Sequence, residues 1–401
     1  MFKPKPGFRI ELHYVVSHSA SRLNRDGADR PKTLEFGGTR RLRQSSQNKK
    51  FTLRYSDDIR QFLDESNKTY GTTEAVQTRQ AATMIKKHIH KKIEKLGFKP
   101  EAYNERIKKG ISSLPTIFVS DKKTSASNEI KMPLVSFSKS EIEHIAEIMV
   151  SIDSENRIEI RDCASTLKEL NKERNSAGGL SPEIQLFGRF TTACVYLKNI
   201  DCPLQVSHGF TVHKTKIEHD YWTAVDDLVK ENGQRESGHI NLRAFGAGAF
   251  YHYHCLDVPL LSRNISNAHP VLERTERITL TQDLIAAFLY AALTRNSTSG
   301  QSGHANHSLP SFSYITYGSA FPYDASSAFE RPVQPDINGG YLVNAKKRFQ
   351  DWMKERKKRY GIFCGYENGM GLDGLDNDLL SMIEDTVLQA TPAINKNIGN
   401  A

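Results

Sequence analysis

An alternating run near the start of the chain is the feature that most constrains its fold. From Arg9 to Ser17, the apolar side chains of Ile10, Leu12, Tyr14 and Val16 recur at every second position. A period of two is typical of a β-strand that buries one face against a core. We therefore expect a sheet, and the rest of the chain must supply the strands that pair with this one.

The later segments predict the order of the other elements. A helix is predicted at about Gln47–Leu63, strand alternation returns in Pro203–Lys216 and Leu242–Val258, an apolar helix ends at Thr294, and Ser311–Tyr317 predicts a last strand. The order strand, helix, strand, strand, helix, strand is that of a ferredoxin-like or RRM-like domain. Sheets of this kind commonly bind single-stranded RNA. The predicted fold class is α+β.

A mainly helical block, from about residue 66 to 180, interrupts this order. The patterns predict a long lysine-rich helix at Thr73–Leu96 and shorter helices at Glu141–Val150 and Ala164–Asn171. Beyond the last strand, Lys346–Tyr360 predicts a basic helix and Pro392–Ala401 a loose tail.

Composition excludes several classes of protein. The longest apolar run, Leu284–Leu293, has ten residues, whereas a membrane-spanning helix needs ~20. The basic start leads into Arg9 and Glu11 rather than an apolar segment, so we expect no signal peptide and a cytoplasmic protein. The five cysteines form no CxxC pair, which supports neither a disulfide framework nor a zinc ribbon. We expect no metal and no cofactor.

Positive charge is concentrated in one segment. The chain has a net charge of +9, and Arg22–Arg54 alone carries an excess of seven positive charges. Such a run is often only a solvated surface, but here glycines and serines interleave with the charge. We expect a long basic loop over Ala20–Gln44, in which Gly37-Gly38 lets backbone approach a phosphate. Ser45 and Ser46 then begin a helix whose positive end attracts anions.

Three motifs carry a resemblance to a known family. The series LNRD, RPKT, FGG, RR, SSQ within residues 23–47, the run PEIQLFGR (182–189), and the stretch QVSHGF to FYHY (205–253) are similar to elements of the CasC family. A weaker match covers 278–333. CasC proteins are the repeating backbone subunits of type I-E CRISPR Cascade complexes. The matched segments make up less than half of the chain.

The resemblance implies an architecture and a role. It implies an RRM-like palm at 1–60 and 184–340 with a thumb hairpin at about 209–246, helical fingers at 61–183, and a C-terminal helical segment and tail at 341–401. Copies would polymerise head to tail along the CRISPR RNA, present its spacer to a target DNA strand, and contact large, small and repeat-handle-binding Cascade subunits. A backbone subunit of this kind is not an enzyme.

The expected RNA-binding residues combine the basic segment with the thumb. Phe51 stands where the family commonly has a basic residue, Gln44 where an apolar one is usual, and Gly300–His304 departs from the family's G-K-Q type element. The expected RNA-binding residues are Ser19, Ser21, Asn24, Arg25, Lys32, Gly37, Gly38, Arg40, Arg41, Arg43, Ser45, Ser46, Gln47, Lys49, Lys50, Arg54, His208, Lys214, Lys216 and Trp222.

Other constellations favour competing hypotheses. His252, His254 and Cys255 could begin a metal site, but zinc needs three or four ligands, so we expect histidines packed within the sheet. The pair Asp226-Asp227 could hold a nuclease metal, although capping or an ion pair explains it as well. An RRM-like endoribonuclease could use His18 as acid or base or Asp26 for cleavage. A host RNA-binding protein that shares only the palm is a third hypothesis.

Overall fold

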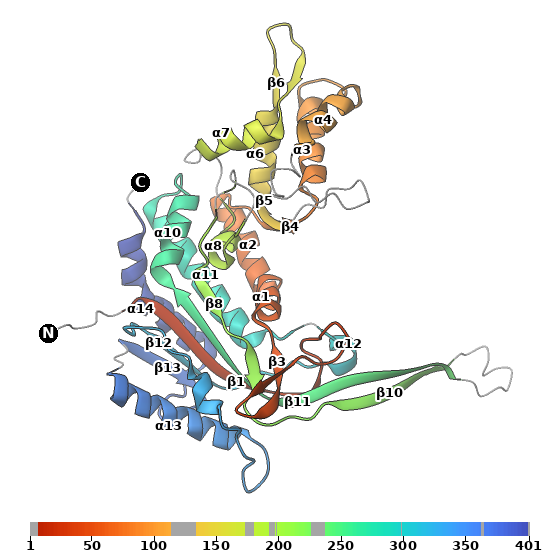
Figure 1. The fold of residues 1–401 in the computed structure, drawn as a ribbon. Coiled ribbons are helices and arrows are strands. Elements are labelled where there is room, and N and C mark those ends of the chain that lie inside the picture. The colour runs from red at the N-terminus through yellow and green to blue at the C-terminus, as the bar shows by residue number, and fades with distance from the viewer. Residues whose placement is uncertain are drawn as a thin grey trace. The chain divides into compact units, whose positions relative to one another are not determined.

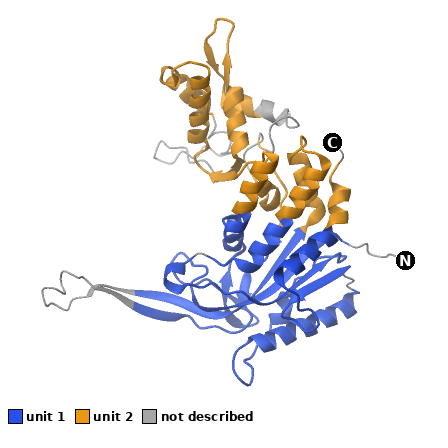
Figure 2. Ribbon diagram, turned by 180° about the vertical axis from the view of Figure 1, so that it is seen from behind, with its two compact units in different colours: residues 1–59, 205–256, 285–390 blue, residues 60–204, 257–284, 391–401 orange. Residues whose placement is uncertain are grey.

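The chain forms two compact units in the computed structural model, which describes residues 7–113, 134–172, 180–191, 197, 199–225, 237–297, 299–361 and 365–399. Unit 1 comprises residues 1–59, 205–256 and 285–390, and unit 2 comprises 60–204, 257–284 and 391–401 (Figure 2). The fold is α+β, with an RRM-like palm, a large helical fingers insertion and a thumb hairpin. The predicted fold class is confirmed, whereas the predicted bounds of these parts stay predictions.

A mostly antiparallel sheet forms the palm in unit 1 (Figure 1). Its strands lie in the order β13-β12-β1-β11-β9-β3-β2, and β8 and β10 also pair with β11. Strands β12, β1, β11 and β9 are the four of the ferredoxin-like order, with the first and third in the middle. The strand bounds are β1 Arg9–Ser21, β2 Thr33–Phe36, β3 Thr39–Gln44, β8 Leu204–Val206, β9 Gly209–Thr211, β10 Glu218–Val225, β11 Ser237–Asp257, β12 Pro310–Tyr317 and β13 Tyr366–Met370.

Helices cover one face of this sheet. Strand β1 presents Tyr14 on that face, where α1 (Ser46–Arg54) places the Lys49 ammonium 5.4 Å from the centre of the Tyr14 ring. His254 packs its ring edge-on against Phe288 of α11 (Arg274–Thr294), with the ring centroids 6.1 Å apart. His252 and His254 are both buried, as expected for histidines packed within a sheet.

The C-terminal part of unit 1 covers the opposite face. Phe349 and Met353 of α13 (Leu342–Tyr360) and Phe329 of the 3-10 helix η2 (Ala325–Phe329) pack there on a core that includes Tyr251 and Phe312. This is the face on which RRM sheets stack RNA bases. Because it is buried, RNA cannot lie across the sheet, and the expectation of sheet-face binding does not apply to this chain.

Four predicted elements differ from the structure. The long helix predicted at Thr73–Leu96 is a strand, β4 (Ala75–Thr78), followed by a helix, α3 (Ala81–Lys95). The single helix predicted at Gln47–Leu63 is two helices, α1 and α2 (Asp57–Tyr70), because the Ser56 hydroxyl accepts a hydrogen bond from the backbone N–H of Ile59 and begins a new helix. The tail predicted at Pro392–Ala401 is wrong, since α14 (Leu379–Asn397) continues through Pro392. The predicted basic loop contains the β2–β3 hairpin.

Unit 2 holds the fingers. Ile85, Ile89 and Ile93 of α3 (Ala81–Lys95) share a buried core with Ile145 and Met149 of α6 (Lys139–Met149). No helix in the described ranges has the length and apolarity needed to cross a bilayer. The remaining bounds are β4 Ala75–Thr78, α3 Ala81–Lys95, η1 Pro100–Tyr103, α4 Asn104–Ile111, β5 Val135–Ser138, α6 Lys139–Met149, β6 Val150–Ile152, β7 Ile158–Ile160, α7 Cys163–Lys172, α8 Pro182–Phe187, α10 Val258–Ala268 and, in unit 1, α12 Gln301–His304.

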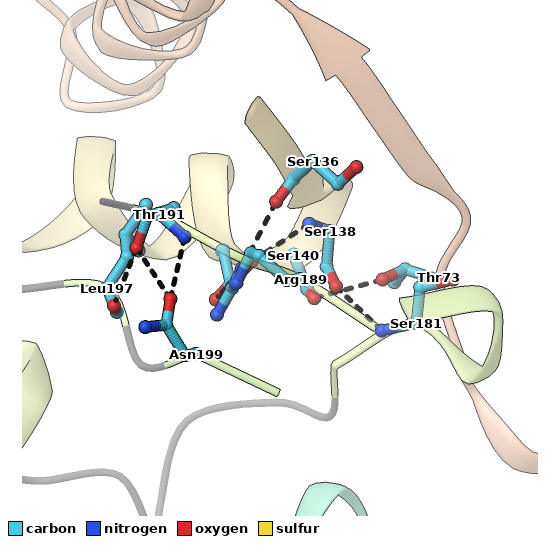
Figure 3. A network of polar contacts seen from close by, with 10 residues as sticks. Thr73, Ser136, Ser138, Ser140, Ser181, Arg189, Thr191, Leu197 and Asn199 are labelled. Atoms are coloured by element: carbon cyan, nitrogen blue, oxygen red, sulfur yellow. Dashed lines mark hydrogen bonds and ion pairs between the residues drawn. The ribbon is translucent and has the colours of Figure 1, made fainter. Parts of the chain in front are cut away.

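The PEIQLFGR motif has a structural role in unit 2. Its last residue, Arg189, donates from Nη1 to both carboxylate oxygens of Glu141, at 2.7 and 3.0 Å, and to the Ser136 carbonyl at 3.2 Å (Figure 3). Nearby, the Ser138 hydroxyl accepts from the backbone N–H of Ser181 at 2.6 Å. The motif thus ties α8 and the segment after it to the start of α6.

The thumb is a long hairpin that continues from the palm sheet. Strand β10 pairs antiparallel with β11 from Glu218↔Phe245 to Val225↔Ser237 (Figure 1). The remainder of β11 belongs to the palm, where it pairs with β9. The Asp226-Asp227 pair lies outside the described residues.

Candidate nucleic-acid interface

Strand pairing brings two distant basic segments together at one edge of the palm. Arg43 of β3 pairs in register with Phe210 of β9, and its Nη1 lies 3.0 Å from Nδ1 of His208. The backbone N–H of Thr215 donates to the Arg40 carbonyl at 3.2 Å. Lys214 and Lys216, the neighbours of Thr215, are exposed, as is Arg40. We call Lys32, Arg40, Arg43, His208, Lys214 and Lys216 the palm-edge cluster.

The palm-edge cluster is strongly positive. Partial burial, together with the charges of Arg43 and Lys32, lowers the pKa of His208 below its ordinary value. Within the described ranges, no carboxylate lies close enough to form an ion pair with Arg40, Lys214 or Lys216. Phosphates are the groups that such a cluster attracts.

The Gly37-Gly38 pair forms the turn of the β2–β3 hairpin. Both residues have positive φ, +57° and +67°, as a two-residue hairpin turn of this hand requires. A Cβ on Gly37 would lie 1.7 Å from the Glu330 carbonyl oxygen, so the protein's own backbone occupies the space expected for a phosphate. Gly38 is exposed and faces open space.

Arg41 points into the protein, away from its exposed neighbour Arg40. Its guanidinium donates to three backbone carbonyls, those of Thr211 (2.9 Å), Glu330 (3.1 Å) and Phe329 (3.2 Å). The side chain is fully buried. Arg41 therefore stabilises the palm and cannot contact RNA as the sequence analysis expected.

Lys49 is the second expected RNA ligand that lies inside. Its Nζ donates to the carbonyls of Ala292 (3.3 Å) and Arg295 (3.1 Å), at the C-terminal end of α11. Burial lowers the pKa of Lys49 to about 7. A cation at a helix C-terminus is favourable, and this position again excludes RNA.

The segment between β1 and β2 is folded by its own ion pairs. The Asp29 carboxylate accepts from Arg22 and, at 2.5 Å, from Arg25. Asp26 accepts from the backbone N–H groups of Ala28 (2.9 Å) and Arg30 (3.0 Å), which, with the Arg30 side chain, keep its pKa low. The Asp26 carboxylate thus organises the loop, and Arg25 is partly neutralised.

The start of α1 is held mainly by local hydrogen bonds. Ser45 is buried, its hydroxyl accepts from Asn48 N–H at 3.3 Å, and its own N–H donates to the Asn24 side chain at 3.0 Å. Ser21 is also buried and donates to the Gly246 carbonyl at 3.2 Å. Outside the palm-edge cluster and the hairpin turn, Ser19, Arg25 and Gln47 of the expected set are exposed, and Asn24, Ser46, Lys50 and Arg54 are half-buried.

His18, the candidate acid or base, lies in the interior. Its Nδ1 is 2.6 Å from the Asn306 side-chain oxygen, and burial lowers its pKa to about 4. In the described part of the chain, no three His, Cys, Asp or Glu side chains are arranged to hold a metal ion. Trp222 lies in β10 opposite Asn241, but its side chain falls outside the described part of the structure.

A polar pocket adjoins the start of α1, and the sequence analysis did not identify it. The pocket has a volume of about 560 Å³ and is lined by Asn24, Arg25, Asp26, Gly27, Asp29, Asn48, Phe51, Ser297 and Ser299. Phe51 is 54% exposed, and its ring centroid lies 4.6 Å from that of Tyr55. Two aromatic residues four apart on a polar helix face were the available signal.

Comparisons with known proteins give a family and a fold. The family described as CT1975-like protein matches residues 10–366. A search of curated proteins found no match. A chain of a structure described as "CRISPR RNA-guided surveillance complex, pre-nicking" is 22% identical with a TM-score of 0.68, covering 95% of this chain and all of that one. A chain of a second structure, "CRISPR RNA-guided surveillance complex", is 19% identical with a TM-score of 0.55, covering 95% and 99%.

Proposed function

The chain belongs to the CT1975-like protein family, and from that premise we propose that it is an RNA-binding backbone subunit of a Cascade-type CRISPR complex. The palm-edge cluster is the observation that carries this proposal, because it joins positive groups from β3 and from the base of the thumb. Among the described residues, Arg40, Lys214 and Lys216 form no ion pair with a carboxylate. Two chains of similar fold come from structures named as RNA-guided surveillance complexes, which supports the same role. The type I-E subtype is part of the proposal.

The ligand we propose is the CRISPR RNA, held through its phosphates. Contacts to phosphates carry no sequence information, which suits a protein that must accept any spacer. The covered sheet face leaves the edge of the palm and the thumb base as the route for the RNA. Target DNA, paired with the guide, and the large, small and repeat-handle-binding subunits are the further partners that we propose.

Lysine variants test the RNA-binding role. We expect K214A/K216A to weaken the binding of unrelated RNA sequences to a similar extent, because each lysine contributes sequence-independent affinity. The matched control is K347A/K354A, which removes the same charge from exposed positions on α13. Fluorescence anisotropy with two unrelated RNAs measures both. Equal affinity of K214A/K216A and the control, or a loss for only one RNA, would contradict the proposal.

Assembly into a filament is the second element of the role. A repeating subunit needs a head-to-tail interface, because a two-fold interface closes after two copies. We propose that the thumb supplies part of this interface. Replacing residues 217–238 by a short Gly/Ser linker should leave a folded monomer and abolish RNA-bound filaments and the regular nuclease-protection ladder on the guide. Full-length filaments with an unchanged ladder would refute the thumb's role.

We propose that the subunit does not cleave RNA. The endoribonuclease alternative depends on His18 or Asp26. His18 is buried beside Asn306, and the partly exposed Asp26 carboxylate is hydrogen-bonded within its own loop. Incubation with labelled CRISPR RNA and complementary RNA, with and without Mg²⁺, should give binding without products. Cleavage that H18A or D26A abolishes would establish the enzyme instead.

A further inference from the structure

Phe51 and Tyr55 form an aromatic surface that the palm-edge cluster does not explain. Both lie on the outer side of α1, exposed by 54% and 41%, with their ring centroids 4.6 Å apart. The Arg54 guanidinium lies over the Tyr55 ring at 5.4 Å. Single exposed aromatic side chains are common and need no explanation, so the surroundings of this pair decide whether it has a role.

The surroundings are a pocket rather than open surface. Phe51 is the one apolar side chain among the described residues that line the cavity of about 560 Å³ next to α1. That volume lies within the range of ~300–1,000 Å³ that small-ligand sites occupy. The other walls come from the segment between β1 and β2 and from Ser297 and Ser299. One wall is therefore a flat ring, and the others are polar.

The chemistry of the walls selects the ligand. The charged side chains on the lining are Arg25, Asp26 and Asp29, and their ion pairs leave no uncompensated positive charge there to attract a phosphate. Each of these carboxylates already holds an arginine, which leaves amide, hydroxyl and backbone groups to bind a neutral polar ligand. A flat ring for stacking beside amide and hydroxyl groups for hydrogen bonding is the set of contacts that proteins use for unstacked bases.

We propose that this pocket binds one unstacked nucleobase of single-stranded RNA, with Phe51 as the stacking platform and Asn24, Asn48 and Ser299 facing the base edge. The proposal rests on the proposed function, since it concerns the same RNA. Lys50 precedes Phe51 in α1 and Arg54 follows it by three positions, so both residues are close to Phe51 along the helix.

Substitutions of Phe51 in the full-length chain test the stacking contact. We expect F51A to bind a short single-stranded RNA about 5- to 150-fold more weakly, the loss that one stacked base typically contributes, whereas F51W keeps near wild-type affinity. The salt dependence of binding should be the same for F51A and wild type, because stacking releases no counterions. F51R should steepen the log–log salt slope by about 0.7 through one new phosphate contact. F190A, at an exposed phenylalanine of unit 2, is the control.

Two readouts make the proposal falsifiable and separate it from the proposed function. RNA that carries 2-aminopurine should show fluorescence quenching with wild type and F51W but not with F51A, and an oligonucleotide without bases should bind wild type and F51A equally. If wild type binds RNA and F51A matches it in affinity and quenching, the base pocket is refuted and the backbone role stands. If wild type binds no RNA, the proposed function fails as well.

Discussion

Replacing Lys49 by methionine tests whether this lysine stabilises the palm or contacts RNA. Lys49 is buried between α1 and the sheet, 5.4 Å from the centre of the Tyr14 ring, and donates to the carbonyls of Ala292 and Arg295. Methionine has a similar length and no charge, so K49M fills the same space while it removes the two hydrogen bonds.

The cost of burying the Lys49 ammonium determines how much K49M should change the free energy of unfolding. The pKa of Lys49 falls from 10.5 to about 7, and each pKa unit corresponds to roughly 1.4 kcal/mol. At pH 7 the buried ammonium therefore costs about 4 kcal/mol relative to the unfolded chain. K49M removes this cost and leaves two carbonyls without a donor, at about 1–3 kcal/mol each. We expect the free energy of unfolding at pH 7 to change by less than about 2 kcal/mol, in spite of full burial.

The dependence on pH distinguishes this account from simple packing. Because the pKa in the folded state is lower than in the unfolded state, the unfolded chain binds more protons between pH 7 and 10.5. Stability therefore rises with pH in this window. From pH 7 to 9, wild type should gain about 2 kcal/mol relative to K49M.

Urea denaturation of both proteins at pH 7, 8 and 9 measures this difference, and RNA affinity is measured on the same samples. If the free energy of unfolding depends on pH in the same way for wild type and K49M, Lys49 is not buried with a depressed pKa. A loss of RNA affinity in K49M with unchanged stability would show that Lys49 contacts RNA after all.

Five further substitutions address the turn, the interior arginine and the palm edge. G37A should destabilise the chain by about 3 kcal/mol in urea denaturation, through positive φ and the Glu330 carbonyl, whereas G38A, which faces open space, should cost about 1 kcal/mol. R41A should cost about 3 kcal/mol because carbonyls lose their donor, while R40A should leave stability unchanged and weaken RNA binding. A phosphate of bound RNA next to His208 would raise the lowered pKa of this side chain. RNA affinity should therefore rise as pH falls from 7.5 to 5.5, and H208Q should show no such rise.

The sheet was predictable from the sequence, but the burial of both its faces was not. The alternation of Ile10, Leu12, Tyr14 and Val16 is strong enough to indicate a strand by itself. The intervening residue His13 is equally buried, because α13 brings Phe349 against it from the other side. Sequence patterns within one strand do not show which distant helix covers its second face. In the sequence of the basic helix α13, only its apolar side indicates that the helix packs on a sheet.

Charge counting predicted the segment that holds the candidate interface, but it did not identify which of its side chains are exposed. Arg40 and Arg41 are neighbours in β3, and successive residues of a strand point to opposite faces. Choosing between them requires knowing that Thr211 and Glu330 bring carbonyls to one face. The pairing of β3 with β9, which brings Lys214 near Arg40, joins residues about 170 positions apart, and no pattern in the sequence predicted it.

Because some of the expected RNA-binding cations lie inside the protein, one protomer can neutralise fewer phosphates than the sequence suggested. Ten lysines and arginines were expected to bind RNA from the sequence, but Arg41 and Lys49 are buried and Arg25 is paired with Asp29. The other seven, Lys32, Arg40, Arg43, Lys50, Arg54, Lys214 and Lys216, have exposed or half-buried side chains and set an upper limit. At about 0.7 per phosphate on single strands, the log–log salt slope should not exceed about −5 per protomer, against about −7 for all ten. Titrations of a short RNA, sized for one protomer, between 50 and 300 mM salt measure the slope. A slope near −7 would mean that further cations, such as the buried Arg41 and Lys49, reach the RNA. The assignment of the interface to the seven accessible residues would then be wrong.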